Sequence, residues 1–320
     1  MIIIVTGCCG FIGSYLCEFL LKNKIYEKVI GLDNLDPYYD VNIKLSNLTI
    51  LQKYDNFIFL KENIIDSQSI YKYKPDIICH LASLAGVRNS INKPIDYCRV
   101  NIEGFINILE QSKNIELEIN KKIKIVFASS SSVYGNNTKI PFKETDEINK
   151  INSPYAASKK CMETLGQTYN QLYNLDIIAL RFFTVYGPRG RPDMAPYKFI
   201  KNIIENKVIK KYGTGDSFRD YTYIDDIIQG IINSLLYDLN GFRIYNLGNN
   251  EKISLNEFIE TCMKVTNKKA IIEQIENQKG DVNGTCADIT KSQKELDYLP
   301  KTSLEEGLKK LYDYLDKCLF

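Results

Sequence analysis

The N-terminal stretch constrains the fold of this chain more than any other part of it. Residues 2–5 are a continuous isoleucine and valine run, which is typical of a strand buried on both faces. Glycines at positions 7, 10 and 13 follow, and residues 14–21 then show helical periodicity. A strand, a glycine turn and a helix in this order predict dinucleotide binding, because the glycines let a pyrophosphate approach the helix N-terminus.

Apolar runs recur along the chain at the spacing of a βαβ pattern. We expect strands at residues 28–33, 57–60, 76–82, 123–128 and 176–183, and helices at 95–113 and 154–173. The predicted fold class is therefore α/β, a Rossmann-type doubly wound parallel sheet with a smaller C-terminal α/β lobe.

The pattern changes after residue 183. Residues 184–196 are rich in glycine, proline and arginine, so we expect neither a regular helix nor a strand there. We predict an NAD-binding domain over residues 1–183, joined by return segments at about 221–250, and a second lobe over residues 184–320. The arginines of this lobe suit a diphosphate or a carboxylate, and solvated surface charge is an equally good interpretation.

An acid follows the second predicted strand. Asp33 lies 20 residues after Gly13, where a carboxylate accepts hydrogen bonds from the adenosine ribose and repels a 2′-phosphate. This position favours NAD over NADP. The alternative is an aspartate that only caps the end of a strand.

Tyr155 and Lys159 are four residues apart, so on a helix their side chains share one face. A tyrosine with its ordinary pKa of about 10 is a poor base at neutral pH, and a nearby ammonium lowers that pKa. The pair therefore suits proton abstraction, although a coincidence on an amphipathic helix has the same spacing. Four serines at 129–132 end the fifth predicted strand, where they form either a polar loop or a hydroxyl donor that faces a substrate.

Composition excludes several classes of function. The net charge of +2 without a basic block argues against nucleic-acid or anionic-membrane binding, and no apolar run approaches the roughly 20 residues of a membrane span. Nine cysteines without a C-x-x-C pair indicate reduced thiols in the cytoplasm. The single histidine, His80, lies in an apolar strand and is expected in the core, so we expect no metal site.

The glycines at 7, 10 and 13, together with Ser130, Tyr155 and Lys159, resemble the extended short-chain dehydrogenase/reductase family. Within it the chain is similar to the NAD-dependent nucleotide-sugar epimerases, and most of all to the UDP-glucuronate 4-epimerases. The likeness runs from Met1 to about Tyr314. It is carried by residues 33–40, 85–88, 129–135, 181–195, 218–226 and 280–282.

The resemblance implies an isomerase that epimerises a UDP-sugar at carbon 4, by hydride abstraction and return through a 4-keto intermediate. UDP-glucuronate is the implied substrate and UDP-galacturonate the product. Related dehydratases have an Asp-Glu pair where Ser131 and Ser132 stand here, which disfavours elimination. An epimerase of UDP-glucose or UDP-N-acetylglucosamine, a dehydratase or reductase, and a non-catalytic nucleotide-binding protein remain alternatives.

The resemblance also assigns roles residue by residue. Tyr155, Lys159 and Ser130 are the implied catalytic groups, and a homodimer through the helices at 95–113 and 154–173 is the implied assembly. The implied NAD contacts, besides Tyr155 and Lys159, are Gly7, Gly10, Phe11, Ile12, Gly13, Asp33, Asn34, Asn63, Ile64, Leu81, Ala82, Ala85 and Asn101. The implied UDP-sugar contacts are Arg88, Ser131, Ser132, Thr184, Arg191, Arg219 and Asp281. Relatives often have aspartate at the position of Asn63.

Overall fold

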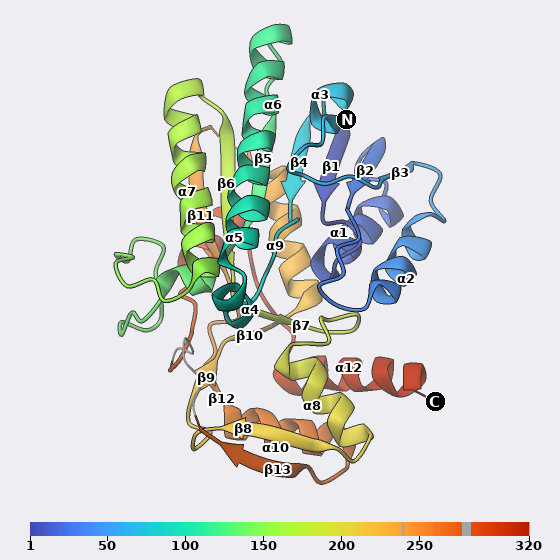
Figure 1. Cartoon of the computed structure of the whole chain (residues 1–320), viewed down its shortest axis with the longest axis vertical. Coiled ribbons are helices and arrows are strands. Elements are labelled where there is room, and N and C mark those ends of the chain that lie inside the picture. Colours follow the sequence, from blue (N-terminus) through green and yellow to red (C-terminus); the bar gives the residue numbers. More distant parts are fainter. Residues whose placement is uncertain (239, 277–282, 320) are drawn as a thin grey trace. The chain divides into compact units, whose positions relative to one another are not determined.

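Seven strands pair into one sheet in the order β11-β6-β5-β4-β1-β2-β3 (Figure 1). The computed structural model describes residues 1–238, 240–276 and 283–319. The pairs β1–β2, β2–β3, β1–β4 and β4–β5 are all parallel. The strands are β1 Ile2–Thr6, β2 Lys28–Leu32, β3 Phe57–Leu60, β4 Ile77–His80, β5 Lys124–Ser130, β6 Asp176–Phe182 and β11 Phe242–Leu247.

The strand order reverses between β1 and β4, so the connecting helices cover both faces of the sheet. Helices α1 (Phe11–Lys22) and α2 (Val41–Leu51) pack together on one face, and α6 (Gly104–Ile119) and α7 (Pro154–Tyr173) pack together on the other (Figure 1). This arrangement confirms the predicted Rossmann-type fold. It also places the point of strand reversal, where open α/β sheets bind ligands, between the carboxyl ends of β1 and β4.

Apolar side chains from both layers fill the interior. Ile4, Ile78 and Ile125 come from adjacent strands, and the tilted rings of Phe105 and Phe127 meet at 4.6 Å between centroids, where α6 packs on β5. All five side chains are buried. At roughly 1.5–3 kcal/mol for each large apolar side chain, burial of such residues supplies the main driving force for this layer packing.

The expected helix at 95–113 is not one regular helix. Helix α5 (Pro94–Tyr97) leads into a π-helical segment, Cys98–Glu103, before α6 begins and continues to Ile119. Wide turns of this kind concentrate at functional sites. Hydrophobic periodicity does not detect them, because the apolar residues on either side keep their helical spacing.

The chain forms two compact units. The first comprises Met1–Gly135, Ile148–Arg181 and Ile231–Tyr245, and the second comprises Asn136–Glu147, Phe182–Gly230 and Asn246–Phe320. Helix α9 (Ile224–Leu236) contributes residues to both. The first unit also contains the short helices α3 (Ser69–Tyr73) and α4 (Val87–Asn92) and a 3₁₀ helix, Ser131–Tyr134.

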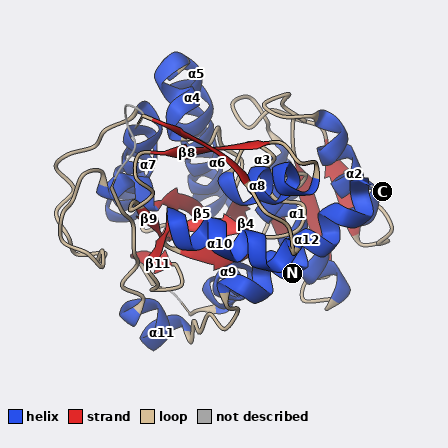
Figure 2. Ribbon diagram, turned by 90° about the horizontal axis from the view of Figure 1, so that it is seen from below, coloured by secondary structure: helices blue, strands red, loops and turns tan. Residues whose placement is uncertain are grey.

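The second unit contains three two-stranded pairs and several helices (Figure 2). The pairs are β7 with β10, β12 with β9, and β13 with β8. Their bounds are β7 Thr184–Tyr186, β8 Val208–Tyr212, β9 Phe218–Arg219, β10 Tyr221–Tyr223, β12 Ile253–Ser254 and β13 Ile271–Ile275. The helices are α8 Ala195–Ile204, α10 Leu255–Thr266, α11 Thr290–Leu296 and α12 Leu304–Leu319.

The expectation of no regular structure at residues 184–196 is wrong at both ends. Thr184–Tyr186 pairs in parallel with Tyr221–Tyr223, and α8 starts at Ala195. Pairing with β10 stabilises β7 although the local composition disfavours a strand. Pro188 and Pro192 lie between β7 and α8, so they interrupt neither element. No helix among the described residues has the length and hydropathy that a membrane crossing requires.

Candidate active site

The glycine turn between β1 and α1 leaves space that a side chain would fill. Gly7 has a φ of +73°, which L side chains rarely adopt. A Cβ at Gly13 would lie 2.1 Å from the Gly7 carbonyl oxygen, so only glycine lets α1 start this close to the turn. Gly10 is the N-cap and has no side chain to cover the N–H groups of Phe11 and Ile12. These residues fit a dinucleotide pyrophosphate at the helix N-terminus.

Asp33 is buried just beyond β2, beside this turn. Its Oδ2 accepts the N–H of Cys9 at 3.1 Å, and its Oδ1 accepts the N–H of Leu35 at 2.8 Å. Lys44 Nζ on α2 lies 3.6 Å from Oδ1 and is itself nearly buried, whereas Asn34 is exposed. Sequence reasoning missed Lys44, because α2 has almost no amphipathic pattern that would mark a buried lysine.

Within the described part of the chain, Cys8, Cys9 and Asp33 form the only set of three His, Cys, Asp or Glu side chains whose ligand atoms lie within 4.8 Å of one another. The cysteines are therefore less scattered than the sequence suggests, since two of them lie together with an aspartate. The carboxylate already accepts two backbone N–H groups and lies near the Lys44 ammonium. Burial raises the pKa of the Cys8 thiol well above its ordinary value. These donors do not fit a resident cation, and the absence of a metal stays a prediction.

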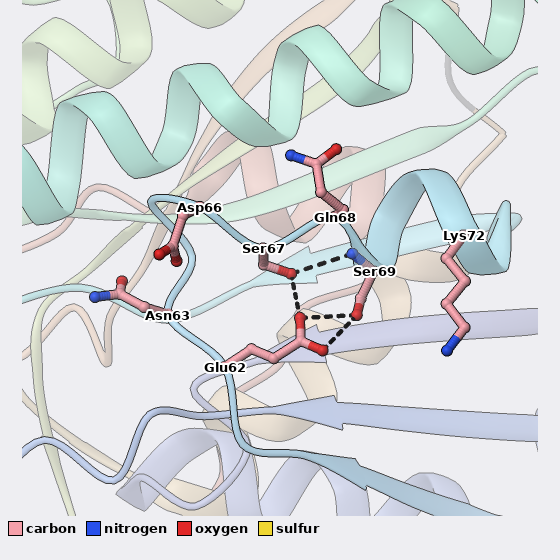
Figure 3. Close-up of a pocket in the computed structure, with 7 residues that line it drawn as sticks. All are labelled: Glu62, Asn63, Asp66, Ser67, Gln68, Ser69 and Lys72. Atoms are coloured by element: carbon pink, nitrogen blue, oxygen red, sulfur yellow. Dashed lines mark hydrogen bonds between the residues drawn. The ribbon is translucent and has the colours of Figure 1, made fainter.

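A hollow of about 440 Å³ opens at the carboxyl end of β3 (Figure 3). The Glu62 carboxylate accepts hydrogen bonds from the hydroxyls of Ser67 and Ser69, at 2.6 and 2.8 Å, on one side of it. Asn63 also lines the hollow, and its Oδ1 accepts the N–H of Ile65 at 3.2 Å. The adjacent Ile64 is buried. Asn63 and Ile64, which are implied NAD contacts, therefore lie just beyond the carboxyl end of β3, and their role stays a prediction.

The segment after β4 meets the glycine turn. Ala82 N–H donates to Thr6 Oγ1 at 3.1 Å, and a Cβ on Gly7 would lie 2.8 Å from Ala82 N. Thr6 Oγ1 also shares a 2.8 Å hydrogen bond with His80 Nδ1. The burial of His80 confirms the expected core histidine and, with the nearby Lys159 charge, lowers its pKa to about 3.

Helix α7 carries Tyr155 and Lys159, and its start is well defined. Ser153 Oγ caps the helix by accepting the N–H of Ala156 at 3.1 Å, and Pro154 occupies the first turn. Lys159 is 1% exposed, and its Nζ donates to Ala128 O at 2.7 Å and to Ser83 Oγ at 3.0 Å. Burial lowers the pKa of Lys159 to about 7.

Tyr155 lies one turn before Lys159, on the same helix face, and is half-buried. Its ring meets that of Tyr97 edge to face, at 6.1 Å between centroids. Ser83, which contacts Lys159, was not predicted from the sequence, because nothing in residues 81–85 shows which side chain turns toward α7.

Asn101 occupies the π-helical segment and is fully buried. Its Oδ1 accepts the N–H of Leu84 at 2.8 Å, and its Nδ2 donates to Leu84 O at 3.0 Å and to Ser158 Oγ at 2.9 Å. Ser158 lies between the two predicted catalytic residues of α7. Asn101 thereby joins the segment after β4, which includes Leu81 and Ala85, to α7.

The serine run bends away from β5 in the 3₁₀ helix. Ser130 Oγ accepts the N–H of Ser132 at 3.1 Å, which leaves its own hydrogen available for donation. Ser131 and Ser132 are half-buried. The preceding Ser129 donates instead to Glu163, which pairs with Arg181. Both members of this pair were missed by sequence reasoning.

Three of the predicted sugar contacts lie in the described part of the second unit. Arg191 forms a two-pronged ion pair with Asp193, at 3.0 and 2.6 Å, and Arg219 Nη1 donates to the carbonyl of Phe218 at 2.8 Å. Thr184 begins β7. Asp281 lies outside the described residues, and Arg88 is exposed on α4 of the first unit. Their roles stay predictions.

Asp220 is a buried acid that sequence reasoning did not single out. Its carboxylate accepts the N–H groups of Asn249, Asn250 and Ala287 at 2.7, 3.0 and 2.9 Å, and the hydroxyl of Thr222 at 3.2 Å. Burial raises its pKa to about 6, against these bonds. The residue links three segments of the second unit, so we interpret it as structural.

The chain is similar to enzymes of one family over nearly its whole length. The family model described as GDP-mannose 4,6 dehydratase matches residues 4–311. The UDP-glucuronate 4-epimerase of Thermodesulfobacterium geofontis is 44% identical over 316 residues, which cover 97% of this chain and 95% of that protein.

Two solved structures extend the likeness to three dimensions. The UDP-glucuronic acid 4-epimerase of Bacillus cereus, in complex with UDP-glucuronic acid and NAD, has a TM-score of 0.92 at 36% identity and covers 99% of this chain and 100% of that one. The UDP-glucose 4-epimerase of Thermotoga maritima, with UDP-glucose, has a TM-score of 0.88 at 30% identity and covers 100% of both chains.

Proposed function

The chain belongs to the family described as GDP-mannose 4,6 dehydratase, within the extended short-chain dehydrogenases and reductases, and we propose that it interconverts UDP-glucuronate and UDP-galacturonate. NAD is the proposed cofactor. The relative that is 44% identical and the solved structure with a TM-score of 0.92 are both UDP-glucuronate 4-epimerases, which supports this substrate over a neutral sugar.

The observation that carries the proposal is the position of Lys159. Its ammonium is held by Ala128 O and Ser83 Oγ at the carboxyl ends of β5 and β4, one helical turn from Tyr155. A positive charge fixed there favours the phenolate form of a neighbouring tyrosine. Tyr155 then takes the proton from the sugar 4-hydroxyl and later returns it.

The other residues of this site hold the cofactor and stabilise the oxygen at carbon 4 of the sugar. Bound NAD supplies the hydride acceptor and donor for carbon 4, and the turn at Gly7, Gly10 and Gly13 together with Asp33 would hold it. Ser130 donates its hydroxyl hydrogen to the oxygen at carbon 4 as that oxygen becomes a carbonyl. Ser131 and Ser132 offer no carboxylate that could drive elimination, so the 4-keto sugar can only take the hydride back. Carbon 4 is inverted when the sugar turns over in the site and the hydride returns to its opposite face.

The uronate carboxylate requires its own partner, and we assign it to Arg191, with Thr184, Ser131 and Ser132 as further contacts. A guanidinium makes two parallel hydrogen bonds to a carboxylate. Arg191 makes such a pair with Asp193, so binding of the substrate exchanges one carboxylate for another. Arg219 is assigned to the diphosphate and Asp281 to the uridine ribose.

We assign NAD to the first unit and the UDP-sugar mainly to the second. The proposed assembly is a homodimer through a four-helix bundle built from α6 and α7 of each copy. A cytoplasmic location is proposed as well, because that compartment keeps nine free thiols, six of them buried, in the reduced state.

The proposal is tested by incubating the purified protein with UDP-glucuronate and following the sugar by NMR, first without and then with added NAD. We expect UDP-galacturonate to accumulate to an equilibrium mixture. The Tyr155→Phe variant should lower the rate roughly 10²- to 10⁴-fold, the usual contribution of one acid–base group. Conversion of UDP-glucose but not of UDP-glucuronate would instead favour a neutral-sugar epimerase.

A further inference from the structure

A buried charged network lies directly behind the proposed catalytic residues, entirely within the first unit. The guanidinium of Arg181 on β6 makes two 2.8 Å bonds to Glu163 on α7, from Nε to Oε1 and from Nη2 to Oε2. Both side chains are 1% exposed. Glu163 Oε1 also accepts the hydroxyl of Ser129 at 2.7 Å.

The network reaches a third segment through Tyr134, the last residue of the 3₁₀ helix. Arg181 Nη1 donates to the Tyr134 hydroxyl at 2.9 Å, and the guanidinium carbon lies 4.8 Å from the centre of the Tyr134 ring. Glu163 therefore holds Ser129, at the start of the segment 129–134, and Arg181 holds Tyr134 at its end.

Two members of this network, Glu163 and Ser129, are close to proposed catalytic groups in the chain. Glu163 follows Lys159 by one turn on α7, and Ser129 immediately precedes Ser130. The Ala128 carbonyl, which accepts the Lys159 ammonium, lies on the other side of Ser129. A shift of Ser129 would therefore move Ser130 and Ala128 together, and with Ala128 the lysine.

The pair remains charged despite its burial. Burial alone would raise the pKa of Glu163, but hydrogen bonds from Arg181 and Ser129 hold that pKa below its ordinary value. Buried ion pairs of this kind add little stability over well-packed apolar residues of similar volume. What a planar guanidinium adds is a fixed direction for each bond.

We propose that Glu163 and Arg181 are positioning residues for the epimerisation. They hold Ser130 and the Ala128–Lys159 contact in register with Tyr155. The proposal rests on the proposed function, because it assumes that Ser130, Tyr155 and Lys159 take part in the epimerisation. It adds two residues that touch neither sugar nor cofactor in that mechanism.

The main test replaces both charges at once, with Glu163→Met and Arg181→Met in one protein. The double variant leaves no unpaired buried charge, so we expect its melting temperature to stay near that of the parent. A positioning role predicts a fall in kcat of about 10- to 100-fold with little change in KM, because misplacement of reacting groups by about 1 Å costs that much.

The pH profile separates positioning from stability. The acid limb of kcat reports the ionisation of Tyr155 in the substrate complex. If the Lys159 ammonium moves away from Tyr155, the phenolate is less stabilised and this limb moves to higher pH. A folded double variant with the kcat and acid limb of the parent would overturn the proposal.

Two substitutions at Ser129 test the positioning role if the double variant does not fold. Ser129→Ala removes the hydroxyl that binds Glu163, whereas Ser129→Thr keeps a hydroxyl. We expect the shifted acid limb in the alanine variant and its restoration in the threonine variant. Identical profiles in the two would contradict the proposal. Lys160→Met, which removes an outer cation 3.5 Å from Glu163, should keep the profile of the parent.

Failure of the proposed function is recognised separately. Turnover of UDP-glucuronate by the parent protein tests the function alone. Ionisation of Tyr155 in the NAD complex, measured as the ultraviolet difference between the parent and Tyr155→Phe, needs no sugar. The double variant should raise the midpoint of this titration, and an unchanged midpoint would count against positioning.

Discussion

At the scale of single residues, Lys159 is a cation held by neutral acceptors. Its two described hydrogen bonds go to a carbonyl and a hydroxyl, and burial lowers its pKa to about 7. In the NAD-free protein this ammonium therefore loses its proton near neutrality. Acceptor oxygens of a bound cofactor that hydrogen-bond to Lys159 would favour the charged form again, which would link cofactor binding to the charge that the chemistry needs.

This buried lysine makes stability depend on pH. Between pH 7 and about 10.5 the unfolded chain binds more protons at Lys159 than the folded one, so the free energy of unfolding rises with pH in that window. We expect the NAD-free parent to gain about 3 kcal/mol over Lys159→Met between pH 7 and 9.5. Urea unfolding of both proteins at each pH measures this difference. A constant difference would show that Lys159 titrates normally.

Arg191 is the residue on which the choice of sugar depends in this account. We expect Arg191→Ala to lower kcat/KM for UDP-glucuronate by about 10²-fold, because a charge-assisted contact to the carboxylate is lost. Loss of carbon dioxide from the 4-keto acid, followed by return of the hydride to carbon 4, should then release a UDP-pentose, visible by NMR.

The matched control for this change is Arg243→Ala, which removes an exposed guanidinium from β11 of the first unit. The control should keep the kinetics of the parent. Unchanged turnover of UDP-glucuronate by Arg191→Ala would remove the assigned role.

Individual site residues were predictable where their chemistry and their neighbours in sequence pointed the same way. Tyr155 and Lys159 were predicted from their spacing together with the family resemblance, and Asp33 from its place after a strand. Lys44, Ser83, Glu163 and Arg181 gave no such signal, because their partners are distant in sequence. A buried arginine in an apolar strand becomes interpretable only when the glutamate that pairs with it is seen.

At the scale of elements, the N-terminal strand, turn and helix form the most constrained part of the chain. A Cβ at Gly13 would meet backbone at 2.1 Å, which no side-chain rotation relieves. We expect Gly13→Ala to weaken NAD binding at least tenfold and to lower the melting temperature, since α1 must move away from the turn.

Calorimetric titration with NAD measures this loss. Phe19→Ala, which truncates a partly exposed side chain on the same helix, should bind NAD as the parent does. A Gly13→Ala variant with full affinity would contradict the assignment of this turn to the pyrophosphate.

Most elements of the first unit follow from hydrophobic period and turn chemistry. Strands β1 and β3 and helix α7 lie where the sequence predicts them. Two failures have a physical cause. The π-helical segment at Cys98–Glu103 depends on Asn101 reaching two other segments, and the short strand β7 exists only through its pairing with β10. Neither interaction is local in sequence.

At the scale of the whole molecule, the family is established over residues 4–311, and the assembly remains a proposal. Ile95, Leu117 and Leu172 are 72%, 75% and 66% exposed on α5, α6 and α7. Apolar side chains at this exposure are consistent with a surface that a second copy covers.

We expect light scattering to give twice the 36.8 kDa mass of one chain. Leu172→Glu should weaken the dimer measurably, because it introduces a charge into the proposed interface. Leu236→Glu, on α9, is the control with a similarly exposed leucine. A monomeric parent protein would refute the proposed four-helix contact.

The central claim is that one sugar carbon loses and regains the same hydride while Tyr155 handles the proton. UDP-glucuronate with deuterium at carbon 4 tests it most directly, with the product examined by NMR in ordinary water. The account predicts UDP-galacturonate that keeps its deuterium at carbon 4. Product that has exchanged this deuterium for solvent hydrogen would contradict it.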